Sequence, residues 1–186
     1  MPTSPSASIV RNLRPRWVVV CLLCVAVVFY AANAGDDFLF DDTPALSGNE
    51  LVQISGERFD EWRTAAFSSS AGPLSRPLTM VTFALQHALE GGFSARSLKL
   101  GNIVIHLVIA GLLFLLFRAL VAALVAQGKL RCDPGWVAAL AMGFWLLHPL
   151  HVSTVLYAVQ RMAQLSTLFT VLGLLLFVRW RSRWAE

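Results

Sequence analysis

Four apolar stretches constrain this chain more than any other feature. A helix needs roughly 20 apolar residues to cross about 30 Å of membrane hydrocarbon. The stretches lie near residues 17–34, 98–125, 135–150 and 162–179. Hydrophobic residues make up 56% of the 186 residues and charged residues 14%, whereas soluble domains carry about a quarter charged residues. The sequence therefore predicts an all-α, polytopic membrane helix bundle with about four transmembrane helices.

The distribution of Lys and Arg predicts how the bundle is oriented. Basic residues occur in the polar head 1–16, in the connection 118–131 and in the tail after residue 178, but are sparse in the connection after residue 147. The positive-inside rule then places both termini in the cytoplasm and the loop 35–97 outside. The head is expected to be disordered. One alternative stays open, because the Ala32-Asn33-Ala34 ending also fits a cleaved signal peptide.

The loop 35–97 is long and is expected to contain two short helices, near 57–67 and 77–90. Pro77 suits the first turn of the second helix, and Gly91 suits its end. Apolar residues recur along this helix at helical spacing: Leu78, Val81, Leu85 and Leu89. Amphipathic helices between spans favour an interfacial location, so the loop is predicted to lie on the membrane surface.

Acidic residues cluster where the first apolar stretch ends. Asp36 and Asp37 are followed by Asp41 and Asp42, with Phe38, Leu39 and Phe40 between the two pairs. A carboxylate cluster at this position suits a catalytic or ion-binding device. It equally suits a solvated marker of the translocated side, and the residues alone leave both interpretations open.

Further polar residues lie within or beside the apolar stretches. Asn102 and His106 are four residues apart in the second stretch, so one helix face carries both. Such residues usually face the bundle interior or a cavity, for catalysis or for hydrogen bonding between helices. His148 and His151 form an HxxH pair, which is weak support for a metal site without a third ligand. Arg76 precedes the second loop helix as a basic anchor.

Four motifs together resemble the protein O-mannosyltransferase-like family. FLFDDTPALSGN resembles the F-x-F-D-D-x-P-x-I-x-x-N start of that family's first extracytoplasmic loop. RPLTMVTFALQHAL resembles its R-P-L segment and the helix after it. LKLGNIVIHLVIAGLL resembles its second span, and LHPLHVSTVLYAVQRMAQL resembles its H-P-x-H turn. The motifs occur in the family's order between residues 17 and 180, and they look most like bacterial members that carry tetratricopeptide repeats.

The resemblance implies a GT-C type glycosyltransferase that moves a sugar from a polyprenyl-phosphate carrier to a protein or glycan acceptor. A carboxylate of Asp41 or Asp42 would act as the general base. Arg76 and Arg161 would bind the donor phosphate, because guanidinium can hold phosphate with two hydrogen bonds. The residues expected to line the cavity are Asn102, His106, His148, His151 and Gln160.

The resemblance also implies the surroundings of the chain. The expected partners are the lipid bilayer, the lipid-linked sugar, and a second chain if one completes the membrane domain. The expected location is a bacterial inner membrane. No nucleic acid is expected. No cofactor is assigned, and a divalent metal is left open. Members of the family have about twice as many spans, so the chain is interpreted as a fragment, a degenerate product or half of a split enzyme. The alternatives are a non-catalytic membrane partner and a transporter subunit that uses His106.

Overall fold

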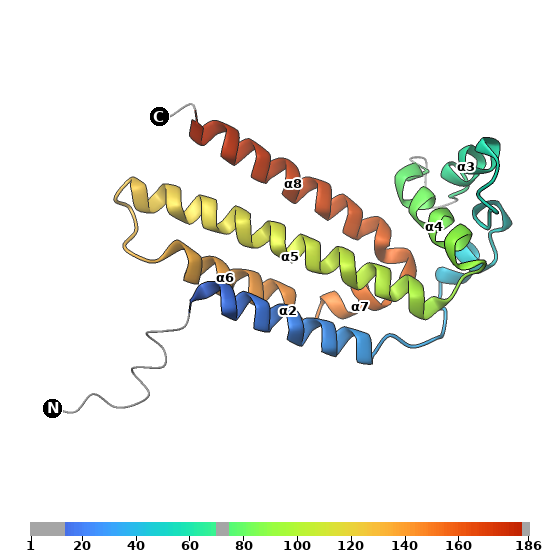
Figure 1. Cartoon of the computed structure of the whole chain (residues 1–186), viewed down its shortest axis with the longest axis horizontal. Helices are drawn as coiled ribbons and strands as arrows, with labels where there is room; N and C mark the ends of the chain where they lie inside the picture. Colours follow the sequence, from blue (N-terminus) through green and yellow to red (C-terminus); the bar gives the residue numbers. More distant parts are fainter. Residues whose placement is uncertain (1–13, 70–74, 184–186) are drawn as a thin grey trace. The chain divides into compact units, whose positions relative to one another are not determined.

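The computed structural model describes residues 14–69 and 75–183, and these two ranges contain helices and turns but no strand (Figure 1). The long helices are α2 (Pro15–Ala32), α5 (Ala95–Ala126) and α8 (Arg161–Arg183). α2, α5 and the stretch Ala158–Arg181 are long and apolar enough to cross a membrane, judged by length and composition. This confirms the prediction of an all-helical membrane bundle. Most of the polar head lies outside the described residues.

The third apolar stretch forms a helix shorter than the expected 135–150. α6 (Pro134–Leu146) has 13 residues, which is about 20 Å of helix. It ends where the N–H of Leu147 bonds back to the carbonyl of Gly143, at 3.1 Å. Pro149 disfavours helical geometry at the residue before it, so the chain turns before the short helix α7 (His151–Leu156) begins.

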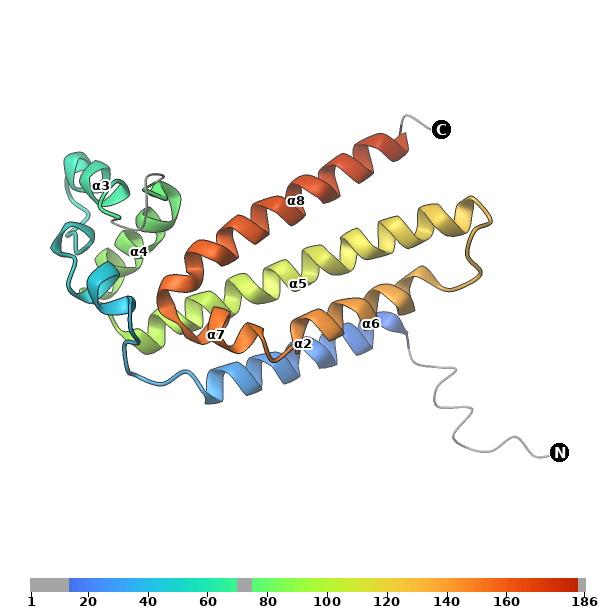
Figure 2. The same ribbon diagram turned by 180° about the vertical axis from the view of Figure 1, so that it is seen from behind.

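Two compact units make up the structure. The described residues of the first unit are 14–28, 107–148 and 170–183. In this unit the start of α2 lies beside α6 in both views (Figures 1 and 2). Gly143 permits this approach, because a Cβ there would lie 2.6 Å from a methyl carbon of Leu22. Small residues commonly let membrane helices pack closely in this way.

The second unit comprises residues 29–106 and 149–169, except for residues 70–74. Its loop contains the π-helical turn η1 (Thr43–Ser47), the 3₁₀ turn η2 (Glu50–Val52) and the helices α3 (Phe59–Ala66) and α4 (Pro77–Glu90). The two helices predicted near 57–67 and 77–90 therefore both exist. A single apolar core joins the loop to the starts of α5 and α8, and its buried residues are Leu46, Val52, Ile54, Ala65, Met80, Phe83, Ala84, Leu98, Ala158 and Met162.

α4 begins and ends as predicted but turns a different face to this core. Pro77 occupies its first turn, and Gly91 ends it with a left-handed φ of 70° and an N–H bonded to the carbonyl of His87. The buried face consists of Thr79, Met80, Phe83 and Ala84. By contrast, the predicted apolar stripe points outward: Leu78 is 52% exposed, Leu85 46% and Leu89 77%. The helical spacing was right, whereas the core lies under the other side of the helix.

Candidate functional site

Asp42 holds together two segments that lie far apart in the sequence. Its carboxylate accepts hydrogen bonds from the N–H groups of Leu39 at 3.1 Å, Ala158 at 3.4 Å and Val159 at 2.7 Å. The side chain is fully buried. All three donors are backbone groups outside regular α-helix, and such groups need partners when they are buried. Asp42 thus fixes the acidic loop against the turn that follows α7.

Asp41, the adjacent residue, differs from Asp42 in the exposure and the hydrogen bonding of its side chain. Its side chain is exposed, and its carboxylate has no hydrogen-bond partner among the described residues. Only its backbone is held, because its N–H donates to the Tyr157 hydroxyl at 2.8 Å. The preceding residue, Phe40, has a φ of 42°, a left-handed conformation that costs about 1–3 kcal/mol outside glycine. The backbone that leads into Asp41 is therefore held in an unusual geometry while the carboxylate of Asp41 stays accessible.

Asn102 binds the same turn, but as a hydrogen-bond donor. Its amide nitrogen donates to the carbonyls of Tyr157 at 3.0 Å and Ala158 at 3.2 Å, and its side chain is fully buried. Asp42 accepts the N–H groups of this turn, and Asn102 donates to its carbonyls. Non-helical backbone at membrane depth is tolerated only where protein or water satisfies it. The two side chains together meet that requirement.

Arg161 lies behind the turn and is almost completely buried. Its Nε donates to the Asn102 side-chain oxygen at 3.0 Å. Its Nη2 donates to Gln86 Oε1 at 2.8 Å and to the Leu98 carbonyl at 3.0 Å, and its carbon Cζ lies 4.5 Å from the ring centre of Phe83. These partners are all neutral. Arg161 was expected to bind the donor phosphate. In the structure, most of its N–H groups instead donate hydrogen bonds to other groups of the protein.

Arg76, the other predicted phosphate ligand, lies at the surface. It precedes Pro77 with a left-handed φ of 41°, and its side chain is exposed. Among the described residues, its side chain makes one hydrogen bond, donated from Nη1 to the sulfur of Met162 at 2.9 Å. Because a thioether is a weak acceptor, this guanidinium keeps most of its hydrogen-bonding capacity for a ligand.

The predicted histidines belong to two different units. His106 is buried and lies edge-to-face with Tyr30, with ring centres 5.4 Å apart, and 5.3 Å from the ring centre of His151. His148 belongs to the other unit, where its ring contacts Phe144. Gln160 is half-buried and ends the 3₁₀ turn η3 (Ala158–Gln160). Within the two described ranges, no group of three or more His, Cys, Asp or Glu side chains could hold a metal ion.

Two buried polar residues of this region were not predicted as site residues. The Nζ of Lys99 donates to the carbonyls of Gly35 at 2.9 Å and Asp37 at 2.8 Å, so the ammonium anchors the chain that leaves α2. Gln164 donates to the Thr154 carbonyl at 2.7 Å, whereas its side-chain oxygen is buried without a partner. In the sequence, each of these two residues is visible only as a polar residue inside an apolar stretch. That pattern does not show which group the side chain will bind.

The fold and this site define an all-helical integral membrane protein with an ordered acidic loop. The chain is 31% identical to the human "Protein O-mannosyl-transferase TMTC4" over 171 residues, which is 88% of this chain and 23% of that protein. It is 30% identical to the Drosophila melanogaster "Protein O-mannosyl-transferase Tmtc2" over 173 residues, 87% of this chain and 17% of that protein. For the Caenorhabditis elegans "Protein O-mannosyl-transferase F38B6.6", the identity is 27% over 177 residues, 91% of this chain and 23% of that protein.

The chain thus spans about a quarter or less of the length of the curated relatives that it matches. No protein-family model matches it, and no solved structure matches it. The similarities support the resemblance to the protein O-mannosyltransferase-like family that the four motifs indicated. The relatives come from animals, so they do not single out the bacterial members.

Proposed function

We propose that this chain forms the part of a GT-C type membrane glycosyltransferase that carries its catalytic loop. The complete enzyme transfers a sugar from a polyprenyl-phosphate donor to a hydroxyl group of a protein or glycan acceptor. The names of the relatives make mannose the first sugar to test. A longer gene product or a second chain supplies the rest of the membrane domain. We also propose that both termini are cytoplasmic, with the acidic loop outside, and that the membrane is a bacterial inner membrane.

The observation that carries the proposal is the contrast between Asp41 and Asp42. A general base must be accessible to the hydroxyl whose proton it removes, and its carboxylate must be free to accept that proton. Asp41 meets both conditions, whereas the carboxylate of Asp42 is buried under three backbone N–H groups. We assign the base to Asp41 and a positioning role to Asp42.

In the proposed reaction, the Asp41 carboxylate takes the proton of the acceptor hydroxyl. The hydroxyl oxygen forms a bond to the anomeric carbon of the sugar, and the bond from that carbon to the phosphate oxygen breaks. The lipid phosphate leaves with the negative charge. Arg76 is the ligand of choice for this phosphate, since its guanidinium is exposed and its one hydrogen bond within the described residues goes to a thioether. Arg161 supports the site from behind through Asn102.

The test measures mannose transfer from a polyprenyl-phosphate donor in membranes that contain the completed enzyme. Asp41→Asn should lower turnover by about 10²- to 10⁴-fold, the usual contribution of a general base. Arg76→Ala should raise KM more than it lowers kcat, provided that it binds the phosphate equally in substrate and transition state. Asp36→Asn is the matched control, because Asp36 is an exposed carboxylate of the same loop, and it should keep full turnover.

An Asp41→Asn enzyme with full turnover at an unchanged protein level would contradict the assignment of the base. The alternative function is that of a non-catalytic integral membrane partner or a degenerate fragment. In that case no variant of the loop would alter transfer by the completed enzyme, although removal of the chain would lower the level of the protein that it accompanies.

A further inference from the structure

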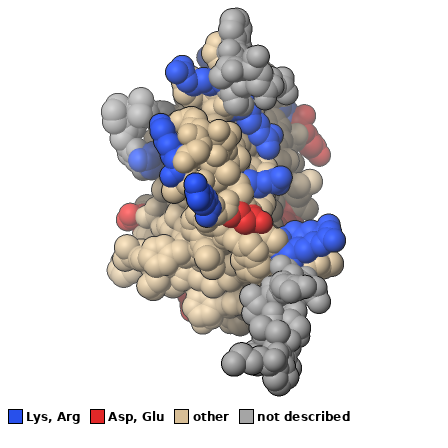
Figure 3. All heavy atoms as spheres, turned by 90° about the vertical axis from the view of Figure 1, so that its left-hand side faces the viewer, with Lys and Arg blue, Asp and Glu red and all other residues tan. Residues whose placement is uncertain are grey.

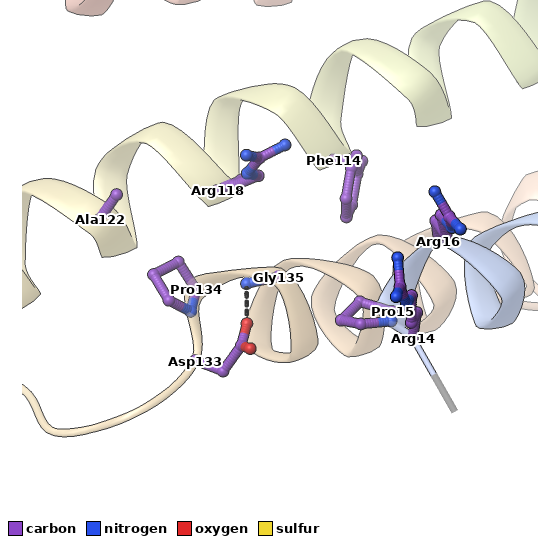
Figure 4. Close-up of a pocket in the computed structure, with 9 residues that line it drawn as sticks. All are labelled: Arg14, Pro15, Arg16, Phe114, Arg118, Ala122, Asp133, Pro134 and Gly135. Atoms are coloured by element: carbon purple, nitrogen blue, oxygen red, sulfur yellow. Dashed lines mark hydrogen bonds between the residues drawn. The ribbon is translucent and has the colours of Figure 1, made fainter. Parts of the chain in front are cut away.

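A second candidate site lies in the first unit, whereas the acidic loop belongs to the second unit. A cavity of about 580 Å³ opens between the start of α2, the later part of α5 and the start of α6 (Figure 4). This volume is within the range of about 300–1,000 Å³ that is usual for ligand sites. The residues that line the cavity are Arg14, Pro15, Arg16, Phe114, Arg118, Ala122, Asp133, Pro134 and Gly135.

Three guanidinium groups border this cavity. Arg14 and Arg16 come from the start of α2, and Arg118 comes from α5, as Figure 4 shows. All three side chains are exposed, and none forms an ion pair within the part of the chain that the structure describes. Guanidinium is the side chain that best matches phosphate, because its planar fork can donate two parallel hydrogen bonds.

The one acidic residue of the cavity is already engaged. Asp133 caps α6: its Oδ1 accepts a hydrogen bond from the N–H of Gly135 at 2.6 Å (Figure 4) and another from the N–H of Trp136 at 3.3 Å. A carboxylate at a helix N-terminus is stabilised there by the helix dipole. The carboxylate therefore neutralises the helix end, and the three arginines keep an excess of positive charge in the cavity.

If the membrane-spanning part of α5 starts near Leu98, the cavity beside Arg118 lies at headgroup depth. α5 has 32 residues, about 48 Å at 1.5 Å per residue, so it is longer than the roughly 30 Å of hydrocarbon. A segment of about 20 residues that starts near Leu98 ends just before Arg118. The last turns of α5 then extend into the headgroup region, where the starts of α2 and α6 also lie against the cavity.

The surface around the cavity is basic as well. Figure 3 shows Lys and Arg side chains gathered on the face that carries the starts of α2 and α6 and the end of α8. Asp133 is the sole acidic residue among the described residues of the first unit. The exposed basic residues of that unit are Arg14, Arg16, Arg118, Lys129, Arg131, Arg179 and Arg181.

We propose that this cavity binds the phosphate of an anionic phospholipid headgroup, with Arg16 and Arg118 as its main ligands and Arg14 beside them. The apolar ring of Phe114, which lies one turn before Arg118 on α5, suits the glycerol and upper acyl region of such a lipid. Basic pockets between membrane helices are known to select anionic lipids in this way. The site does not depend on the acidic loop or on the proposed sugar transfer.

The test uses the purified chain in detergent micelles, titrated with phosphatidylglycerol or phosphatidylcholine, with bound lipid counted by native mass spectrometry. Phosphatidylglycerol should bind at least about tenfold more tightly than phosphatidylcholine, since each basic residue near the lipid contributes about fivefold. The double variant Arg16→Gln/Arg118→Gln should therefore lose about 25-fold in phosphatidylglycerol affinity. The matched control Lys129→Gln/Arg131→Gln removes the same charge outside the cavity and should change the affinity less than about twofold.

Three results would overturn the proposal. Equal losses in the two double variants would mean that the charge of the whole face, and not the cavity, attracts the lipid. Equal affinities for the two lipids would remove the role of net headgroup charge. Complete displacement of phosphatidylglycerol by millimolar inorganic phosphate would assign the cavity to a soluble anion. Because all the altered side chains are exposed, the variants should keep the fold, and an unchanged thermal unfolding temperature checks this.

Discussion

The sharpest prediction compares two neighbouring aspartates under the same change. Asp42→Asn keeps one acceptor oxygen and replaces the other by an amide that can only donate. The amide can take either orientation: with its nitrogen at the Oδ2 position the N–H groups of Leu39 and Ala158 lose their acceptor, and with its nitrogen at the Oδ1 position the N–H of Val159 loses it. A buried donor left without an acceptor costs about 1–3 kcal/mol. At least one donor is unpaired in either orientation, so the free energy of unfolding should fall by about 2 kcal/mol or more.

Asp41→Asn is the control for this prediction. Its exposed carboxylate has no partner in the described ranges, so the change should stay within about 0.5 kcal/mol. For a chain of this length, 1 kcal/mol corresponds to about 2–4 °C in Tm. The expected result is a decrease of about 4–8 °C or more for Asp42→Asn and about 2 °C or less for Asp41→Asn.

The assay is thermal unfolding in detergent micelles, combined with amide hydrogen exchange. In the Asp42→Asn variant, exchange should accelerate either at the N–H of Val159 or at those of Leu39 and Ala158, depending on which of them lose their acceptor. Equal Tm values for the two variants would refute the reasoning, as would unchanged exchange at all three amides. Either outcome would mean that the carboxylate of Asp42 does not hold the loop against the turn after α7.

Three further predictions follow from the same unit and from the topology. Arg161→Lys keeps the charge but cannot reproduce the forked donation, so Tm should fall by several degrees, and an unchanged Tm would argue against its structural role. Gly101→Ala would place a Cβ 2.7 Å from Nη2 of Arg161 and should destabilise the chain by about 1–3 kcal/mol, whereas Gly111→Ala in the same helix, with open space around it, should not. In a cysteine-free background, maleimide should label Glu57→Cys from outside and Gln127→Cys only from the cytoplasm, and the reverse pattern would invert the proposed topology.

Sequence patterns predicted the features that depend on local spacing. The i, i+4 relation of Asn102 and His106 predicted one buried polar face, and both side chains are indeed buried. Pro77 and Gly91 predicted the ends of α4 because each acts through its own backbone geometry. The exposed leucines of α4 show the limit of this approach. Helical spacing tells which side chains share a face, but not which face the rest of the chain covers.

The division of roles between Asp41 and Asp42 could not be read from the sequence. The two residues are adjacent and chemically identical, and their difference arises from partners 116 and 117 residues further along the chain. Lys99 was similarly unassigned, because its partners are backbone carbonyls that any residue type could provide. A carbonyl acceptor leaves no compositional signal in the sequence.

The hydrogen bond from the N–H of Val159 to the carboxylate of Asp42 has a consequence for biosynthesis. The two residues are 117 positions apart, and ribosomes add about 5–20 residues per second. After Asp42 is made, about 6–23 s therefore pass before its partner exists. During this interval the acidic loop lacks the segment that orders it. The backbone at position 41 can be fixed only once Tyr157 and the turn through Val159 have been made, so a nascent chain that stalls before this turn presents an unassembled site.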